Sequence, residues 1–129
     1  MAKILVMEDS AFQRRLLVLI LEAAGHTVLQ AANGEEGLRI AETGEPECIL
    51  LDLNMPDMSG LQVLQLLRDR HVDTPAVVFS ADTEDTTKQQ CLERGAAAFV
   101  IKSPDGNELL GVIAEILRSK NGGKRQNDA

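Results

Sequence analysis

The stretch CILLDLNMP, residues 48–56, places four apolar residues directly before a carboxylate, Asp52. A continuous apolar run, without alternating polar positions, is typical of a parallel strand that is covered on both faces. A charged side chain is costly to bury without a partner, so the acid should lie where the strand leaves the core. The stretch therefore predicts a buried strand whose carboxyl end faces a polar site.

Four more apolar runs of strand length occur along the chain, at residues 4–7, 27–29, 76–79 and 99–101. Segments of helix length separate the five runs, which gives a repeating strand–helix pattern. Right-handed crossovers between parallel strands then predict a doubly wound sheet with helices on both faces. The expected fold class is α/β, a flavodoxin-like (βα)5 parallel sheet with strand order 2-1-3-4-5.

Helix start and stop signals agree with this pattern. Ser10, Asn33 or Gly34, and Ser59–Gly60 are expected to begin the first three helices, and glycines follow several of the helices. The fourth segment, residues 83–94, is unusually polar. It predicts a mostly exposed helix, or alternatively a surface that shifts or binds a partner.

Composition limits the class of protein. The 129 residues suit one domain, expected at 1–118, with 119–129 as a flexible tail or a truncated linker. A net charge of −7 argues against direct nucleic-acid binding. The two cysteines show no metal-ligand spacing and are expected to be reduced thiols. With neither a leader nor a membrane span expected, the predicted location is the cytoplasm.

Polar side chains follow four of the five predicted strands: Glu8–Asp9, Asp52, Ser80 and Lys102. Ligands bind outside the carboxyl ends of strands in open α/β sheets, and the first and third strands are neighbours in the expected order. Glu8, Asp9 and Asp52 should therefore converge.

Two unit charges 4 Å apart repel by about 4 kcal/mol at an effective dielectric of 20, so protons or a cation must relieve three crowded carboxylates. Oxygen ligands favour Mg²⁺, with Mn²⁺ as an alternative.

The same set of groups points to phosphoryl transfer. Asp52 can supply an attacking oxygen, while the Ser80 hydroxyl and the Lys102 ammonium can bind phosphoryl oxygens. A carboxylate nucleophile beside a cation and a lysine thus predicts an aspartate that becomes phosphorylated.

The sequence resembles the response-regulator receiver domain of two-component signalling. The matching stretches are ILVMEDS (4–10), ILLDLNMPDMSGLQVL (49–64), VVFSAD (77–82) and GAAAFVIKSP (95–104), within a resemblance that covers about residues 3–118. By position, the resemblance implies that Glu8 and Asp9 bind the metal, that Asp52 accepts the phosphoryl group, and that the backbone carbonyl of Asn54 completes the metal ligands.

It further implies that Ser80 is the switch hydroxyl, that Lys102 contacts the phosphoryl group, and that Phe99 is the aromatic switch residue. The implied output surface is the face formed by the fourth helix, the fifth strand and the fifth helix.

The implied partners are a sensor histidine kinase or a histidine phosphotransfer protein, and an output protein or domain that the sequence does not name. Neither nucleic acid nor a membrane is an expected direct partner, and the expected state is a monomer or a phosphorylation-dependent dimer. The resemblance implies no enzymatic activity beyond the chain's own aspartyl phosphorylation and dephosphorylation.

One departure from the family pattern is Ser103, which separates Lys102 from Pro104. The Lys102–Ser103 bond is expected to be trans, since a non-proline cis bond costs about 3 kcal/mol.

Three other classes of protein fit these residues less well. An aspartyl-nucleophile phosphohydrolase would carry an acid where this chain has Asn54. Ser103 is the one feature that supports a constitutive interaction module that has lost phosphorylation. For a flavodoxin, the acidic loop after the first strand would repel the flavin phosphate.

Overall fold

The computed structural model describes residues 2–103 and 106–128, with side chains as far as Ser119. Five parallel strands form one sheet in the order β2-β1-β3-β4-β5, which confirms the predicted fold class. The strands are β1 (Lys3–Met7), β2 (Thr27–Ala31), β3 (Cys48–Leu51), β4 (Ala76–Ser80) and β5 (Ala98–Ile101). The helices are α1 (Ala11–Ala23), α2 (Gly34–Thr43), α3 (Gly60–Asp69), α4 (Asp85–Glu93) and α5 (Asn107–Asp128).

The strand register aligns the carboxyl ends along one edge of the sheet. Met7 pairs with Ala31 on one side and with Leu51 on the other. Leu51 pairs with Val78, and Ser80 pairs with Ile101. Residues that follow these strands therefore leave the sheet at the same edge.

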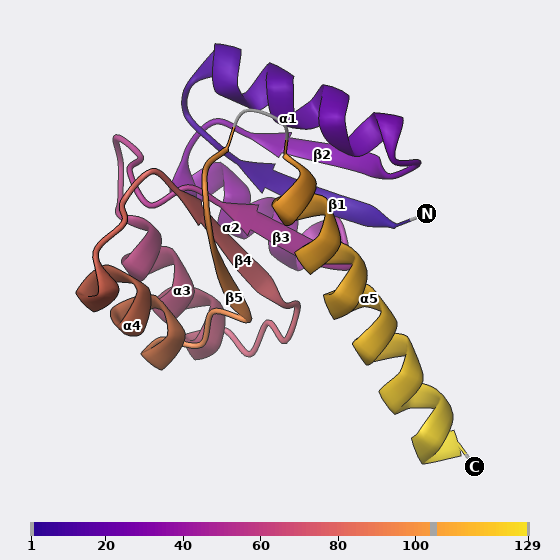
Figure 1. The fold of residues 1–129 in the computed structure, drawn as a ribbon. Coiled ribbons are helices and arrows are strands. Elements are labelled where there is room, and N and C mark those ends of the chain that lie inside the picture. Colours follow the sequence, from indigo (N-terminus) through magenta and orange to yellow (C-terminus); the bar gives the residue numbers. More distant parts are fainter. Residues whose placement is uncertain (1, 104–105, 129) are drawn as a thin grey trace.

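Alternate strand residues enter two separate cores, one on each face of the sheet. Ile4 and Val6 belong to the cluster that packs against α1 and α5, whereas Leu5 and Met7 belong to the cluster under α2, α3 and α4. The helices divide between the two faces in the same way in Figure 1. This double cover explains why β3 is apolar throughout, why β4 is apolar up to its last residue, Ser80, and why both strands are fully buried.

Side-chain caps begin the first three helices at the predicted residues. Ser10, Asn33 and Ser59 each accept a hydrogen bond from the backbone N–H three residues later. At Ser59 the Gln62 side chain also accepts from the Ser59 N–H, which completes a capping box.

Helix α4 is weakly held, as its polar sequence predicts. Cys91 is its one buried residue, while Leu92 is 43% exposed. Its N-cap, Glu84, makes no side-chain capping bond. Because so little apolar surface anchors α4, displacing it costs less than displacing the other helices.

The backbone of α5 is helical to Asp128. The division of the chain at residue 118 stays a prediction. In the described part of the chain, none of the helices combines the length and apolar character needed to cross a bilayer. The Lys102–Ser103 bond is trans, as predicted, and Pro104 lies outside the described residues. Cys48 and Cys91 are buried thiols that are not joined in a disulfide.

Gly60→Ala is expected to destabilise the fold by about 1–3 kcal/mol, because the added methyl group overpacks a rigid contact. A Cβ at this position would lie 2.8 Å from Leu53 Cα and 3.0 Å from the Asp52 carbonyl oxygen. Gly111→Ala is the matched control: a Cβ there meets nothing within 4 Å, so better helix propensity should stabilise α5 by up to about 1 kcal/mol. Urea unfolding measures both, and equal midpoints for the two variants would contradict the overpacking.

Candidate functional site

Backbone hydrogen bonds of the sheet continue past the strand ends and fix the polar residues there. Glu8 N–H donates to the Ala31 carbonyl at 3.0 Å, and Asp52 N–H donates to the Met7 carbonyl at 3.1 Å. Lys102 N–H donates to the Ser80 carbonyl at 2.8 Å. The positions of these side chains are thus set by the sheet rather than by mobile loops.

Glu8, Asp9 and Asp52 converge as the strand order predicts. Each offers a carboxylate oxygen, and the three oxygens lie within 4.8 Å of one another. Glu8 is 2% exposed and Asp52 is 8% exposed, whereas Asp9 is open to solvent. The cluster therefore has a buried floor and an open side.

Lys102 reaches into this cluster from β5. Its Nζ donates to Glu8 Oε1 at 3.3 Å and lies 3.8 Å from Asp52 Oδ1. The ammonium also lies 5.9 Å from the centre of the Phe79 ring. One cation thus faces two buried carboxylates and neutralises them in part.

Burial raises the pKa of Glu8 from 4.5 to about 6, and the charge of the neighbouring Asp52 adds to the rise. A hydrogen bond from the Ser10 N–H to Glu8 Oε2, at 3.1 Å, opposes it. The site therefore carries more negative charge than its single lysine can balance.

Glu8 gives a testable pH dependence in the absence of divalent metal. Glu8 keeps its proton up to about pH 6 in the folded chain but only up to pH 4.5 in the unfolded chain. The tighter proton binding therefore adds to the free energy of unfolding below pH 4.5, and this contribution is lost above pH 6. The loss is about 2 kcal/mol.

In Glu8→Gln the side chain is neutral at every pH, so the free energy of unfolding should lose this dependence on pH. Urea unfolding in EDTA between about pH 4 and about pH 8 measures it, and parallel curves for the two proteins would contradict the prediction.

The donor set fits a hard divalent cation. Its oxygens come from carboxylates, and the open side at Asp9 leaves room for water or phosphate, as Mg²⁺ prefers. Asn54 lies close by: its N–H is 3.4 Å from Asp52 Oδ1, and it forms a short antiparallel bridge with Ser59.

Ser80 and Phe99 lie on the neighbouring strands. Ser80 ends β4 and is 2% exposed, and its hydroxyl oxygen accepts from the Asp82 N–H at 3.1 Å. Phe99 is half-buried and packs against the core under α2, α3 and α4. The roles of these two residues stay predictions.

Sequence reasoning missed two supporting residues. The Arg14 guanidinium donates to the Glu8 carbonyl at 2.7 Å, which its place one turn after the Ser10 cap could have indicated. Asp57, in the loop between β3 and α3, accepts from the N–H groups of Gly34 and Glu35 at 2.9 Å each. That contact is long-range, and no local pattern signals it.

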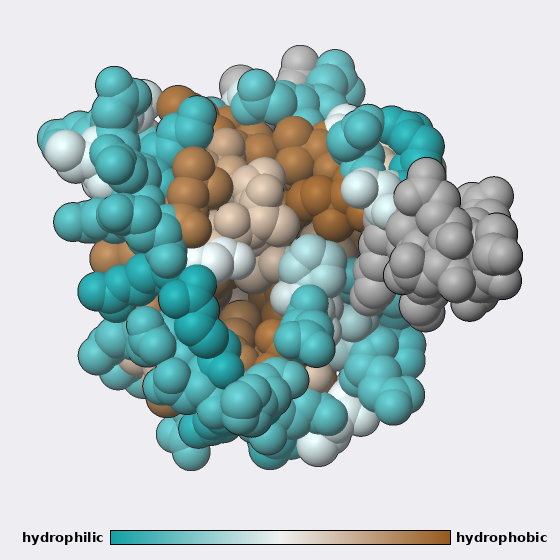
Figure 2. Space-filling view, turned by 90° about the horizontal axis from the view of Figure 1, so that it is seen from below, coloured by the Kyte–Doolittle hydropathy of each residue, from teal (hydrophilic) through white to brown (hydrophobic). Residues whose placement is uncertain are grey.

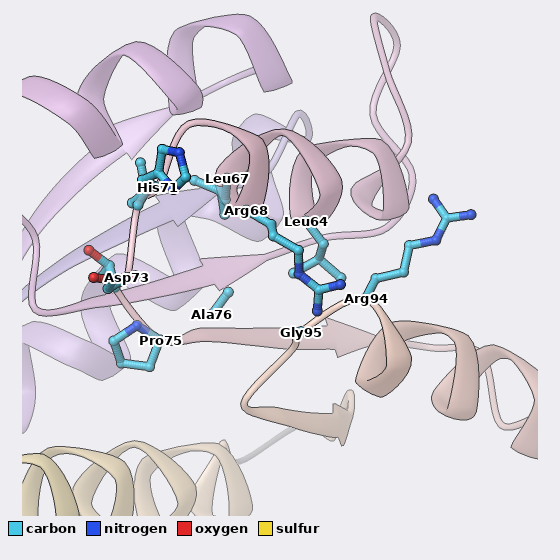
Figure 3. Close-up of a pocket in the computed structure, with 11 residues that line it drawn as sticks. Leu64, Leu67, Arg68, His71, Asp73, Pro75, Ala76, Arg94 and Gly95 are labelled. Carbon is cyan, nitrogen blue, oxygen red and sulfur yellow. The ribbon is translucent and has the colours of Figure 1, made fainter.

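A separate pocket of about 390 Å³ lies at the opposite edge of the sheet, where β4 begins. Figure 3 shows Arg68, His71 and Asp73 around it, together with the start of β4 at Ala76. Arg68 donates across to the Glu93 carbonyl at 3.4 Å and so joins the ends of α3 and α4. The acidic cluster contributes nothing to this pocket.

The fold and the acidic cluster at its switch point define a class of protein: a doubly wound α/β domain that presents carboxylates at the carboxyl ends of its strands. Residues 4–114 match the response regulator receiver domain, and the chain belongs to this family. It is accordingly a receiver domain of a two-component response regulator.

Two curated relatives are transcriptional regulators. The cell cycle transcriptional regulator CtrA of Caulobacter vibrioides is 32% identical over 120 residues, which are 93% of this chain and 52% of CtrA. The transcriptional regulatory protein SrrA of Staphylococcus aureus is 34% identical over 116 residues, which are 90% of this chain and 48% of SrrA. The chain thus spans about half the length of these relatives.

Two solved structures share the whole fold. The chemotaxis response regulator CheY4 of Vibrio cholerae is 30% identical, with a TM-score of 0.83 over 90% of this chain and 98% of that one. The response regulator TrrA of Thermotoga maritima, solved in complex with Mg²⁺-BeF, is 29% identical, with a TM-score of 0.82 over 90% of this chain and 99% of that one.

Proposed function

We propose that this receiver domain accepts a phosphoryl group on Asp52 from a phosphohistidine of a sensor kinase or of a phosphotransfer protein. The observation that supports this most is one buried carboxylate, Asp52, held among Glu8, Asp9 and Lys102. The complex of TrrA with Mg²⁺-BeF supports magnesium as the metal.

The proposed metal ligands are carboxylate oxygens of Glu8, Asp9 and Asp52 and the backbone carbonyl of Asn54. When bound, Mg²⁺ would neutralise charge on the cluster and on the transferred group. Mn²⁺, which prefers similar oxygen ligands, is the alternative ion.

Transfer needs few groups from the chain. An Asp52 oxygen attacks phosphorus, an O–P bond forms, and the P–N bond to the donor imidazole breaks with its electron pair on nitrogen. Lys102, already 3.8 Å from Asp52 Oδ1, neutralises the phosphoryl oxygens, and the Ser80 hydroxyl donates to one of them. The chemistry is limited to the chain's own phosphorylation and dephosphorylation.

The donor is proposed to dock beside Lys102, on α1. Phe12, Leu16 and Leu19 are 70%, 42% and 48% exposed. Next to them a hollow of about 480 Å³ extends to Phe79 and Lys102. An apolar surface bordering Lys102 suits a helical partner that must bring its histidine to Asp52.

The proposed output face comprises α4, β5 and α5. Leu92 on α4 and Ile101 on β5 are both more than two-fifths exposed, and α4 is weakly held. When Ser80 turns towards the phosphoryl group, its bond to the Asp82 N–H must adjust, and with it the loop that leads into α4. Figure 2 shows apolar surface at the centre of one face of the molecule, with hydrophilic residues around it.

The test is incubation with acetyl phosphate, with Mg²⁺ or with EDTA, followed by mass spectrometry of the intact chain. The expected result is a gain of one phosphoryl group that requires Mg²⁺. No gain in either condition would instead favour an interaction module that works without phosphorylation.

A further inference from the structure

The loop between β3 and α3 is joined to the start of α2 by one side chain. The Asp57 carboxylate accepts from Gly34 N–H through Oδ1 and from Glu35 N–H through Oδ2, both at 2.9 Å. These N–H groups belong to the first turn of α2, where the helix offers them no internal partner. The Asn33 side chain accepts from the Glu36 N–H, so Asp57 and Asn33 bind different N–H groups of the same turn.

Packing reinforces this contact. A Cβ built on Gly34 would lie 2.4 Å from Met58 Cγ and 2.7 Å from its Sδ, so Met58 lies directly on the helix start. The two hydrogen bonds lower the pKa of Asp57, so its carboxylate stays charged to a lower pH than an ordinary aspartate. The loop tip and the α2 N-terminus are thus fixed relative to each other.

The two connected segments both lead to the acidic cluster. Asn54, in the same loop as Asp57, has its N–H 3.4 Å from Asp52 Oδ1. On the other side, β2 leads into α2, and the Ala31 carbonyl accepts from the Glu8 N–H at 3.0 Å. The contacts thus connect Glu8 to Asn54 through Ala31, the α2 N-terminus and Asp57.

We propose that Asp57 is a positioning residue for the metal site, which holds the Asn54 carbonyl at a fixed place relative to the Glu8 and Asp52 carboxylates. This inference rests on the proposed magnesium-dependent function. Without the Asp57 contact, the loop would still be anchored at its two ends, by β3 and by the Ser59 cap. Its tip would be free to move away from α2. The metal would then have to order the loop when it binds, and its affinity would fall.

Asp57→Ala is expected to weaken Mg²⁺ binding about tenfold, at the lower end of the range for partners that orient metal ligands. Asp57→Asn, which keeps one acceptor oxygen, should fall between this variant and the wild type. Glu35→Gln is the matched control, because it removes one exposed charge from the same helix turn and keeps the backbone donor. Its Mg²⁺ affinity should stay close to that of the wild type.

The chain has no tryptophan or tyrosine, so Mg²⁺ titration is best followed by amide chemical shifts. Without metal, Asp57→Ala should also lose the slow hydrogen exchange of the Gly34 and Glu35 amides. Weaker Mg²⁺ binding in Asp57→Ala, but not in Glu35→Gln, supports the proposal.

Equal affinities in the wild type and Asp57→Ala, or an equal loss in Asp57→Ala and Glu35→Gln, would overturn it. If Asp57→Ala does not fold, Asp57→Asn is judged by the same comparison. If the wild type itself binds no Mg²⁺, the proposed function fails together with this inference. If the wild type binds Mg²⁺ and Asp57→Ala binds it equally well, only the inference fails.

Discussion

Asp52→Asn is expected to abolish phosphoryl transfer from acetyl phosphate, because an uncharged amide oxygen is a poor nucleophile and cannot form a stable acyl phosphate. The variant should fold at least as stably as the wild type in EDTA. It keeps the shape of the side chain and removes one of two buried charges that repel each other.

The measurement is the mass of the intact chain after incubation with donor and Mg²⁺. Asp85→Asn, an exposed acid in the first turn of α4, is the control and should be labelled like the wild type. Undiminished labelling of Asp52→Asn would show that another residue is the acceptor.

Lys102→Ala is expected to slow phosphorylation of Asp52 by about 10²–10³-fold, the usual cost of removing one group that stabilises charge in a transition state. The Lys102 ammonium lies 3.3 Å from Glu8 Oε1 and 3.8 Å from Asp52 Oδ1, so its removal also leaves the cluster more negative. Mg²⁺ affinity should therefore stay the same or rise while the rate falls.

A slower transfer without weaker Mg²⁺ binding distinguishes a role in transfer from a role in folding or in metal binding. Lys88→Ala, which removes an exposed lysine from α4, is the matched control and should leave both quantities unchanged. A Lys102→Ala variant that is phosphorylated at the wild-type rate would remove this lysine from the mechanism.

The sequence was sufficient to predict the fold because its signals are local and agree with one another. The unbroken apolar runs at β3 and β4 indicate strands covered on both faces, and Ser10, Asn33 and Ser59 cap helices at the residues expected. The topology then brings Glu8, Asp9 and Asp52 together without any further assumption.

Contacts between distant segments could not be read in this way. The hydrogen bonds from Gly34 and Glu35 to Asp57 cross more than twenty positions, and a turn with the same sequence could equally face solvent. The sequence pattern predicts a start of α4 at residue 83, but the helix begins at Asp85, because Asp82 accepts from the Glu84 N–H and closes a turn before the helix. The roles of Ser80, Lys102 and Phe99 depend on a phosphorylated state and stay predictions.

Peptide mapping of the chain after phosphorylation tests the central claim most directly. The site holds three carboxylates within 4.8 Å of one another, and Asp52 is the proposed acceptor among them. The expected result is a single label on the peptide that contains Asp52. A label on the peptide that contains Glu8 and Asp9, or a label distributed over exposed acids, would contradict it.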